Sequence, residues 1–325
     1  MPWDYPARRI YKPYKSLRHK ARLLRIVDEL TGKYVQEENK MGRKVFFGNY
    51  KGGVGKTTST YNIGVELAKA FNKHVLLIDL DPQSSLSNVC MAANNQMLDE
   101  LGRNETLNYI YTVYMQAHRI GNINFHVDSK NIIKSVNSID FIPNSLFSVL
   151  GGLDKISMDI GKNIESLLVL RDFIEDNNLQ EKYDFIFFDC PPSNNAITQS
   201  AFLYSDYYII PTIMDSLSSK GVNHYISVIK NIYENYCVEN ESADVLSCIF
   251  GAEPQLIGIF ETMRKGNTNT DNYRNLMKSL GYIFKSEVKD RKSVSEFMGE
   301  GKETDQYEYR HIAKEMLDRI KELEE

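Results

Sequence analysis

Residues 51–58 read Lys-Gly-Gly-Val-Gly-Lys-Thr-Thr, and they stand directly after an apolar segment, 44–48, and directly before a helical pattern that begins at residue 56. Glycines let the backbone turn so that its N–H groups point inward around a phosphate, and the helix that follows adds its positive N-terminal end. This order predicts a phosphate-binding loop. Its candidate ligands for the phosphates are Lys51, Gly52, Gly53, Val54, Gly55, Lys56, Thr57 and Thr58.

The side chains of this loop predict a nucleoside triphosphate with magnesium. In a P-loop, Lys56 would lie along the β- and γ-phosphates, Thr57 would ligate Mg²⁺ and Thr58 would donate to the α-phosphate. Tyr50 stands where the strict pattern has glycine, but the additional Lys51 defines a recognised variant of the motif. The chain has no N-K-x-D motif for reading guanine, so we expect ATP and Mg²⁺ as cofactors.

The rest of the chain alternates short apolar runs with longer amphipathic ones, which is typical of a parallel sheet flanked by helices. The fold class predicted is therefore α/β, a P-loop NTPase with a mostly parallel central sheet. We expect strands at 44–48, 74–79, 139–143, 184–189, 206–211 and 256–262. We expect helices at 56–71, 163–179, 219–236, 270–280 and 307–323, and one or two more within 90–137.

Carboxylates follow two of the predicted strands. Asp79 ends the strand at 74–79, and Asp81 follows two residues later. Asp189 ends the strand at 184–189, directly before Cys190 and Pro191. The carboxyl ends of parallel strands form the edge at which open α/β folds bind ligands. Asp189 is thus the expected Walker B acid, which serves Mg²⁺ in P-loop NTPases.

The net charge of −4 over 325 residues conceals a basic N-terminal arm. Residues 1–44 hold twelve Lys/Arg and five Asp/Glu, which leaves the remainder at −11. We expect residues 1–43 to form a short helical extension before a P-loop ATPase domain at 44–325. The role of this arm remains open: it could pack in a dimer, contact DNA, dock a partner protein or be a solvated arm.

Four motifs together resemble one known family. KGGVGKTT, VLLIDLDPQ, YDFIFFDCPPS and YYIIPT have the order and spacing seen in the ParA-type DNA-partition ATPases of the deviant Walker A group, and the resemblance covers about 44–325. It implies a homodimer that forms on ATP, with Lys51 reaching the phosphates held by the partner. It also implies that Asp81 orients the attacking water. The magnesium site it implies consists of Thr57, Asp81 and Asp189. The family's nucleotide contacts further point to Pro191, Met263 and Arg264.

Other members of this superfamily are disfavoured by local features. The tail 311–325 is net negative, whereas a septum-site ATPase needs a basic amphipathic helix for anionic lipid. The four cysteines are scattered with no C-x-x-C pair, so we interpret Cys190 as a packing residue and not as an iron–sulfur ligand. No apolar run reaches the ~18–20 residues of a membrane span. We expect a cytoplasmic protein.

A second basic segment lies near the C-terminus. Residues 264–292 hold eight Lys/Arg against three Asp/Glu, in a chain whose body is acidic. Non-specific DNA binding needs cations directed at phosphates. The candidates are Lys285, Arg291 and Lys292. The expected function is ATP-driven DNA segregation on the nucleoid, with hydrolysis stimulated by a centromere-binding adaptor. The alternative is a related ATPase that positions a protein cargo and uses the nucleoid as its track.

Overall fold

A computed structural model describes residues 41–119, 126–160, 164–265, 271–278, 282–300 and 307–325. These residues form two compact units, one made of 41–233 with 252–325 and the other of 234–251. The second unit consists of a π-helix, Glu234–Val238, and helix α10 (Ala243–Phe250). The predicted basic arm at 1–43 falls almost entirely outside the described residues, so its helix and its role stay predictions.

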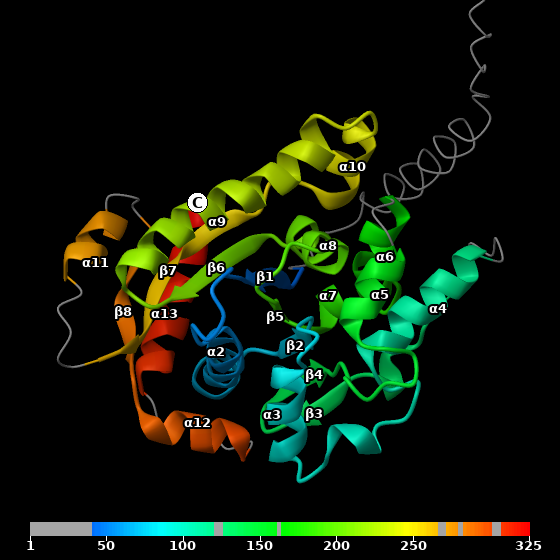
Figure 1. Cartoon of the computed structure of the whole chain (residues 1–325), viewed down its shortest axis with the longest axis horizontal. Coiled ribbons are helices and arrows are strands. Elements are labelled where there is room, and N and C mark those ends of the chain that lie inside the picture. Colours follow the sequence, from blue (N-terminus) through cyan, green and yellow to red (C-terminus); the bar gives the residue numbers. More distant parts are fainter. Residues whose placement is uncertain (1–40, 120–125, 161–163, 266–270, 279–281, 301–306) are drawn as a thin grey trace, which may run out of the picture. The chain divides into compact units, whose positions relative to one another are not determined.

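The larger unit is built on a mostly parallel sheet, as the alternating pattern predicts. In the described part of the chain the strand order is β3-β4-β2-β5-β1-β6-β7-β8, which Figure 1 shows running across the molecule. Only the pair β3 and β4 is antiparallel among the strand pairs described. The strands are β1 (Arg43–Phe47), β2 (Val75–Asp79), β3 (Lys134–Val136), β4 (Ile139–Ile142), β5 (Phe185–Asp189), β6 (Tyr207–Thr212), β7 (Gln255–Arg264) and β8 (Ile283–Lys289).

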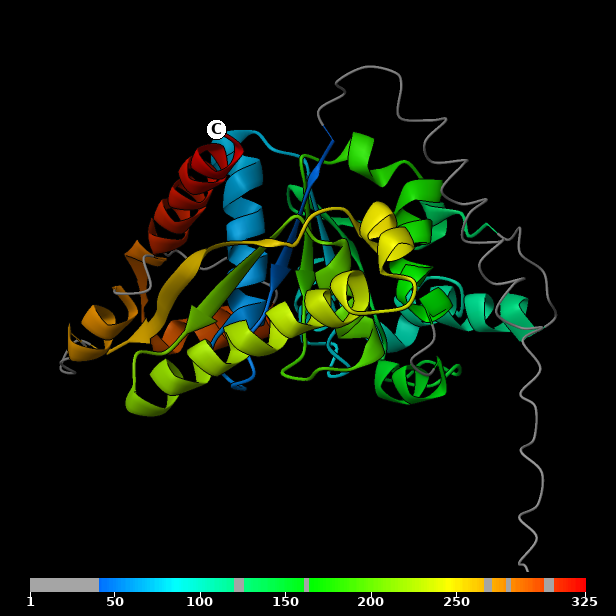
Figure 2. The same cartoon turned by 90° about the horizontal axis from the view of Figure 1, so that it is seen from above.

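Helices cover both faces of this sheet. They are α2 (Lys56–Phe71), α3 (Ser85–Ala93), α4 (Leu107–Arg119), α5 (Leu153–Ile160), α6 (Ile164–Asp176), α7 (Leu179–Lys182), α8 (Ala196–Tyr204), α9 (Ser216–Tyr233), α11 (Asp271–Lys278), α12 (Lys292–Gly299) and α13 (Tyr307–Glu324). Figure 2 shows α13 and α9 on opposite sides of the sheet. The sequence predicts one or two extra helices within 90–137, and the structure has α4 there and the last residues of α3.

Alternate residues of the central strands pack on opposite faces, because successive strand side chains point to opposite sides. In β1, the Phe46 ring lies 5.6 Å from the Phe202 ring of α8. Its neighbour Phe47 belongs to the core that includes residues of α2 and α13 on the other face. Both faces of the strand are therefore buried, which explains why β1 is apolar on consecutive residues.

The apolar stripe of the C-terminal helix packs on the protein. Its buried residues join the main core, and α13 lies against α2, β7 and β8. They are Tyr309, Ile312, Ala313, Met316 and Ile320. In the described part of the chain, no helix is both long enough and apolar enough to cross a membrane.

Several element predictions were wrong. Helices α5, α8 and α12 were not expected. The sequence pattern missed β3 and β8, the two edges of the sheet. β3 has three residues, and β8 (IFKSEVK) is polar at three consecutive positions because an edge strand is only partly covered. The single helix expected at 163–179 ends at Asp176, and α7 follows after Asn178, whose φ of 51° is incompatible with a continuous helix.

Candidate nucleotide-binding site

Strand register brings the predicted loop and carboxylates to one edge. Phe47, at the end of β1, pairs with Asp189 of β5, and Asp189 pairs on its other side with Asp79 of β2. The chain continues from β1 into the glycine-rich loop and then into α2. Three strand ends that are far apart in sequence thus lie side by side, with the loop above them.

The loop depends on glycine at two positions. Gly53 has a φ of 69° and Gly55 a φ of 77°, a region that L-residues with a side chain rarely occupy. Gly55 is also the N-cap of α2, so the first N–H groups of that helix, which have no carbonyl partner within it, open directly onto the end of the loop. Such N–H groups and the helix dipole favour a bound phosphate.

Two side chains outside the predicted phosphate ligands, Asn49 and Thr262, hold this loop in place. The amide of Asn49 donates to the Pro211 carbonyl of β6 at 2.9 Å and accepts from the N–H of Lys51 at 3.0 Å. The hydroxyl of Thr262, on β7, donates to the Val54 carbonyl at 2.8 Å. Asn49 lies two residues before the loop, so its contact could be expected. The family resemblance places Thr262 near the adenine, but nothing in the sequence linked it to Val54, 208 residues away.

The two lysines of the loop have different surroundings. Lys56 is buried and its Nζ donates to the Lys51 carbonyl at 3.3 Å. Burial lowers the pKa of Lys56, and the charges of Asp189 and Asp81 act against that shift. Lys51 is partly exposed and forms an ion pair with Asp215, 2.6 Å from Nζ to Oδ2. Lys56 is therefore placed among the site carboxylates, and Lys51 is directed away from them.

Thr57 and Asp189 form the candidate magnesium site. The Thr57 hydroxyl donates to Oδ2 of Asp189 at 2.7 Å, and the Thr60 hydroxyl donates to Oδ1 at 3.2 Å. Burial raises the pKa of Asp189, the charge of Asp81 adds to the shift, and the Thr57 hydrogen bond opposes it. A hydroxyl beside one carboxylate fits Mg²⁺ in nucleotide sites, where the ion keeps few protein ligands besides the phosphates.

Asp79 and Asp81 have separate roles in the geometry. Asp79 is buried and accepts hydrogen bonds from the N–H and hydroxyl of Ser87 and from the N–H of Asp81. Asp81 is partly exposed, and its backbone carbonyl accepts a 2.6 Å hydrogen bond from the amide of Asn144. Asp79 thus supports the turn from the core, while the partly exposed Asp81 carboxylate accepts from the N–H of Gln83 at 2.9 Å. Asn144 was missed, although it follows the apolar strand β4.

Comparison with known proteins agrees with this geometry. A family model described as an AAA domain (AAA_31) matches residues 42–243. The chain belongs to this family. It is a ParA-type P-loop ATPase, as its curated relatives also indicate. A virulence plasmid ParA family protein of Chlamydia psittaci is 29% identical over 286 residues, which cover 86% of this chain and 93% of that protein. The sporulation initiation inhibitor protein Soj of Bacillus subtilis is 26% identical, covering 69% of this chain and 80% of Soj.

Solved structures share the fold. A putative plasmid partition protein of Borrelia burgdorferi bound to AMPPNP has a TM-score of 0.63 at 20% identity, covering 87% of this chain and 99% of that one. Apo McdA of Cyanothece has a TM-score of 0.64 at 16% identity, covering 85% and 99%. These structures are therefore similar to this chain over most of its length and not only at the phosphate loop.

The remaining predicted nucleotide contacts lie at the same edge of the ParA-type domain. Pro191 is buried directly after the Walker B strand. A Cβ built on Gly55 would lie 3.6 Å from Cε of Met263, so Met263 packs against the end of the loop. The Arg264 guanidinium pairs with Glu287 of β8. Cys190 is buried, and its thiol donates to the Phe188 carbonyl at 3.6 Å, which agrees with its interpretation as a packing residue.

The three predicted DNA contacts differ in exposure and in ion pairing. The side chain of Lys285 on β8 is exposed. Arg291 is also exposed but pairs with Glu308 at 2.8 Å. The side chain of Lys292 lies outside the described residues.

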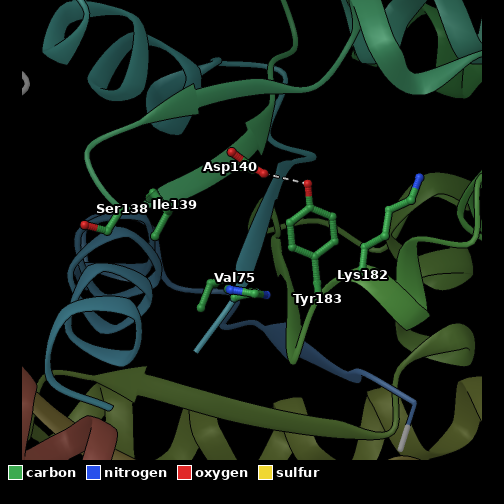
Figure 3. Close-up of a pocket in the computed structure, with 7 residues that line it drawn as sticks. Val75, Ser138, Ile139, Asp140, Lys182 and Tyr183 are labelled. Carbon is green, nitrogen blue, oxygen red and sulfur yellow. Dashed lines mark hydrogen bonds between the residues drawn. The ribbon is translucent and has the colours of Figure 1, made fainter. Parts of the chain in front are cut away.

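A cavity of about 300 Å³ lies at the end of the sheet formed by the amino termini of its strands, the end opposite the phosphate loop (Figure 3). It lies at the amino ends of β2, β4 and β5, where the Tyr183 hydroxyl donates to Asp140 at 2.7 Å. Its other lining residues are His74, Val75, Ser138, Ile139 and Lys182. Its position separates this cavity from the nucleotide site.

Proposed function

We propose that this chain is an ATP-driven DNA-partition ATPase that hydrolyses ATP with Mg²⁺. The observation that carries the proposal is the Thr57–Asp189 contact at the start of α2, beside a loop that carries both the P-loop lysine and the additional Lys51. The similarity to the Chlamydia psittaci virulence plasmid ParA family protein extends over nearly all of that relative and supports the same function.

Hydrolysis would be an in-line attack of water on the γ-phosphate. Lys56 and the first N–H groups of α2 would stabilise the negative charge on the phosphates, in a position fixed before the nucleotide arrives. Asp81 would orient the attacking water, because its carboxylate lies at the edge of the site within electrostatic range of Lys56 and Asp189. Thr57 and Asp189 would hold Mg²⁺, which neutralises charge on the phosphate oxygens when bound.

ATP would also assemble the active form. Lys51 is partly exposed at the open side of the loop, where it can be offered to the nucleotide of a second copy. A lysine that acts across a dimer makes ATP binding and dimerisation one linked equilibrium. The dimer would bind nucleoid DNA without sequence preference through Lys285, Arg291 and Lys292, and a centromere-binding adaptor would stimulate hydrolysis and release. This cycle places the protein in the cytoplasm, on the nucleoid.

The test combines nucleotide hydrolysis with DNA retention. Asp81→Ala should hydrolyse ATP at least about tenfold more slowly than the parent while still binding ATP, because only the water-orienting group is lost. On filters, this variant should retain unrelated DNA duplexes with ATP and release them with ADP. Hydrolysis by Asp81→Ala at the parent rate would contradict the role given to Asp81. Lack of ATP-dependent retention by the parent at low salt would contradict the DNA-partition function.

A matched pair of lysine variants tests the DNA contacts. Lys285→Gln should lower DNA affinity and reduce the slope of log affinity against log salt by about 0.9, the value for one lost phosphate contact. Lys130→Gln is the control, because Lys130 is also strongly exposed but lies outside the basic segment 264–292. Equal effects of the two substitutions would show that the affinity comes from overall charge.

A further inference from the structure

Thr262 connects a distant strand to the phosphate loop. It is buried near the end of β7, and β6 separates β7 from β1, the strand that carries the loop. Its hydroxyl donates to the Val54 carbonyl at 2.8 Å. We propose that Thr262 is a positioning residue, which orients the second half of the phosphate-binding loop by holding the carbonyl of Val54. The inference rests on the proposed function, because it concerns the same nucleotide site.

The geometry of the peptide bond explains how this contact acts. The carbonyl of Val54 and the N–H of Gly55 belong to one planar peptide, and in a trans peptide they point in opposite directions. Holding the carbonyl on β7 therefore turns the Gly55 N–H away from β7. Gly55 is the N-cap of α2, so the orientation of this peptide also sets how the loop enters the helix.

The Val54 peptide lies between two glycines, so the adjoining backbone dihedrals limit its orientation little. Gly53 and Gly55 flank Val54, and both have the positive φ values that glycine adopts freely. Asn49 anchors only the first residues of the loop, through Pro211 and the N–H of Lys51. Lys56 and Thr57 hold later parts of the loop, and Thr262 anchors the peptide between Val54 and Gly55.

The end of β7 is shaped to present Thr262. The pairing of β7 with β8 shifts register between Glu261 and Arg264, and Met263 has a φ of 52°. Such irregularities re-aim side chains at sheet edges. A Cβ built on Gly55 would lie 3.7 Å from Cβ and 3.8 Å from Cγ2 of Thr262, so the β-branched side chain, which has few rotamers, packs on the loop as well as bonding to it.

Three substitutions separate positioning from simple stabilisation. Thr262→Val keeps the shape of the side chain and removes the hydroxyl. Thr262→Ser keeps the hydroxyl and removes the methyl group. Thr212→Val is the matched control, because Thr212 is equally buried at the end of β6 but donates to the Ile213 carbonyl at 3.4 Å.

Two measurements on the full chain complete the test. The first is the Kd for ATP with Mg²⁺, which Thr262→Val should raise by about threefold to tenfold, the value of one hydrogen bond. Thr262→Ser and Thr212→Val should remain near the parent. The second is amide hydrogen exchange of the loop in nucleotide-free protein, which should accelerate in Thr262→Val relative to Thr212→Val.

The outcomes distinguish this inference from the proposed function. Unchanged loop exchange in Thr262→Val would overturn the positioning role, whatever the ATP measurements show. Faster exchange in a chain whose parent form does not bind ATP would keep the positioning role and overturn the proposed function. A lower melting temperature with parent-like exchange and parent-like ATP affinity would show that the hydroxyl only stabilises the fold, and would also overturn the inference.

Discussion

Lys51 and Asp215 form an ion pair, with 2.6 Å between Nζ and Oδ2, that joins the phosphate loop to the segment between β6 and α9. Both side chains are more than one third exposed. An ion pair at this exposure contributes about 0–1 kcal/mol. The pair would therefore hold Lys51 in the single chain while allowing its release at small cost.

Removing this pair should favour the dimer. Asp215→Asn keeps the size of the side chain and removes its charge, so Lys51 would need less free energy to turn toward a second copy. Each of the two copies releases one such pair, so we expect the ATP-dependent dimer to form at up to about 30-fold lower protein concentration. Light scattering with a slowly hydrolysed ATP analogue measures this change. Weaker dimerisation would show that Asp215 also acts within the dimer.

Asn144 should affect hydrolysis more than ATP binding. Its amide holds the Asp81 carbonyl at 2.6 Å, and its own carbonyl oxygen accepts from the Ser84 hydroxyl at the same distance. Asn144→Ala should displace Asp81 and lower kcat by about 10- to 100-fold, with the KM for ATP little changed.

Asn108→Ala is the control for Asn144. Asn108 is equally buried and bonds to the carbonyls of Ser145 and Gly151, but none of its described hydrogen bonds reaches Asp81. Equal losses of kcat in the two variants, measured below both melting temperatures, would contradict a specific role for Asn144.

The buried ion pair between Arg274 and Glu261 should be important for stability. The Nη1 to Oε2 distance is 2.6 Å, and the Glu261 side chain is 1% exposed. Arg274→Met leaves this carboxylate without that partner, so the free energy of unfolding should fall by about 3–5 kcal/mol. Adding Glu261→Leu should recover most of the loss. Urea denaturation measures both, and Arg310→Met, at the exposed pair with Glu66, should change stability little.

Stability of the nucleotide-free protein should depend on pH through Asp79 and Asp189. Burial raises the pKa of both carboxyl groups, and their mutual repulsion raises the pKa of Asp79 further. Between the ordinary and the raised pKa the folded chain keeps protons that the unfolded chain has lost. The free energy of unfolding should therefore fall as pH rises through this window and level off above it.

Asp79→Asn tests the origin of this pH dependence. It removes one of the two charges and keeps a side chain of similar shape, so the fall in stability between about pH 5 and pH 8 should become shallower. Denaturant titrations in the presence of a chelator provide the measurement. An unchanged slope would assign the dependence to other groups.

Much of the site could be predicted from sequence because its chemistry is local. Residues 51–58 are contiguous, and their glycines and hydroxyls need only the strand before them and the helix after them. The alternation of apolar and amphipathic segments also predicted the parallel sheet, and the position of Asp189 at a strand end predicted its place beside Thr57. The edge strands β3 and β8 were missed because partly exposed strands lack a continuous apolar pattern.

The sequence specified the loop, its lysines and the acids at the ends of the central strands. Only the tertiary structure shows which groups hold them in position. Asn144 donates to the Asp81 carbonyl, Asp215 pairs with Lys51, and Thr262 donates to the Val54 carbonyl. These contacts join segments 63, 164 and 208 residues apart. No local pattern encodes them, because they arise only when strand order and register bring distant strand ends to one edge of the sheet.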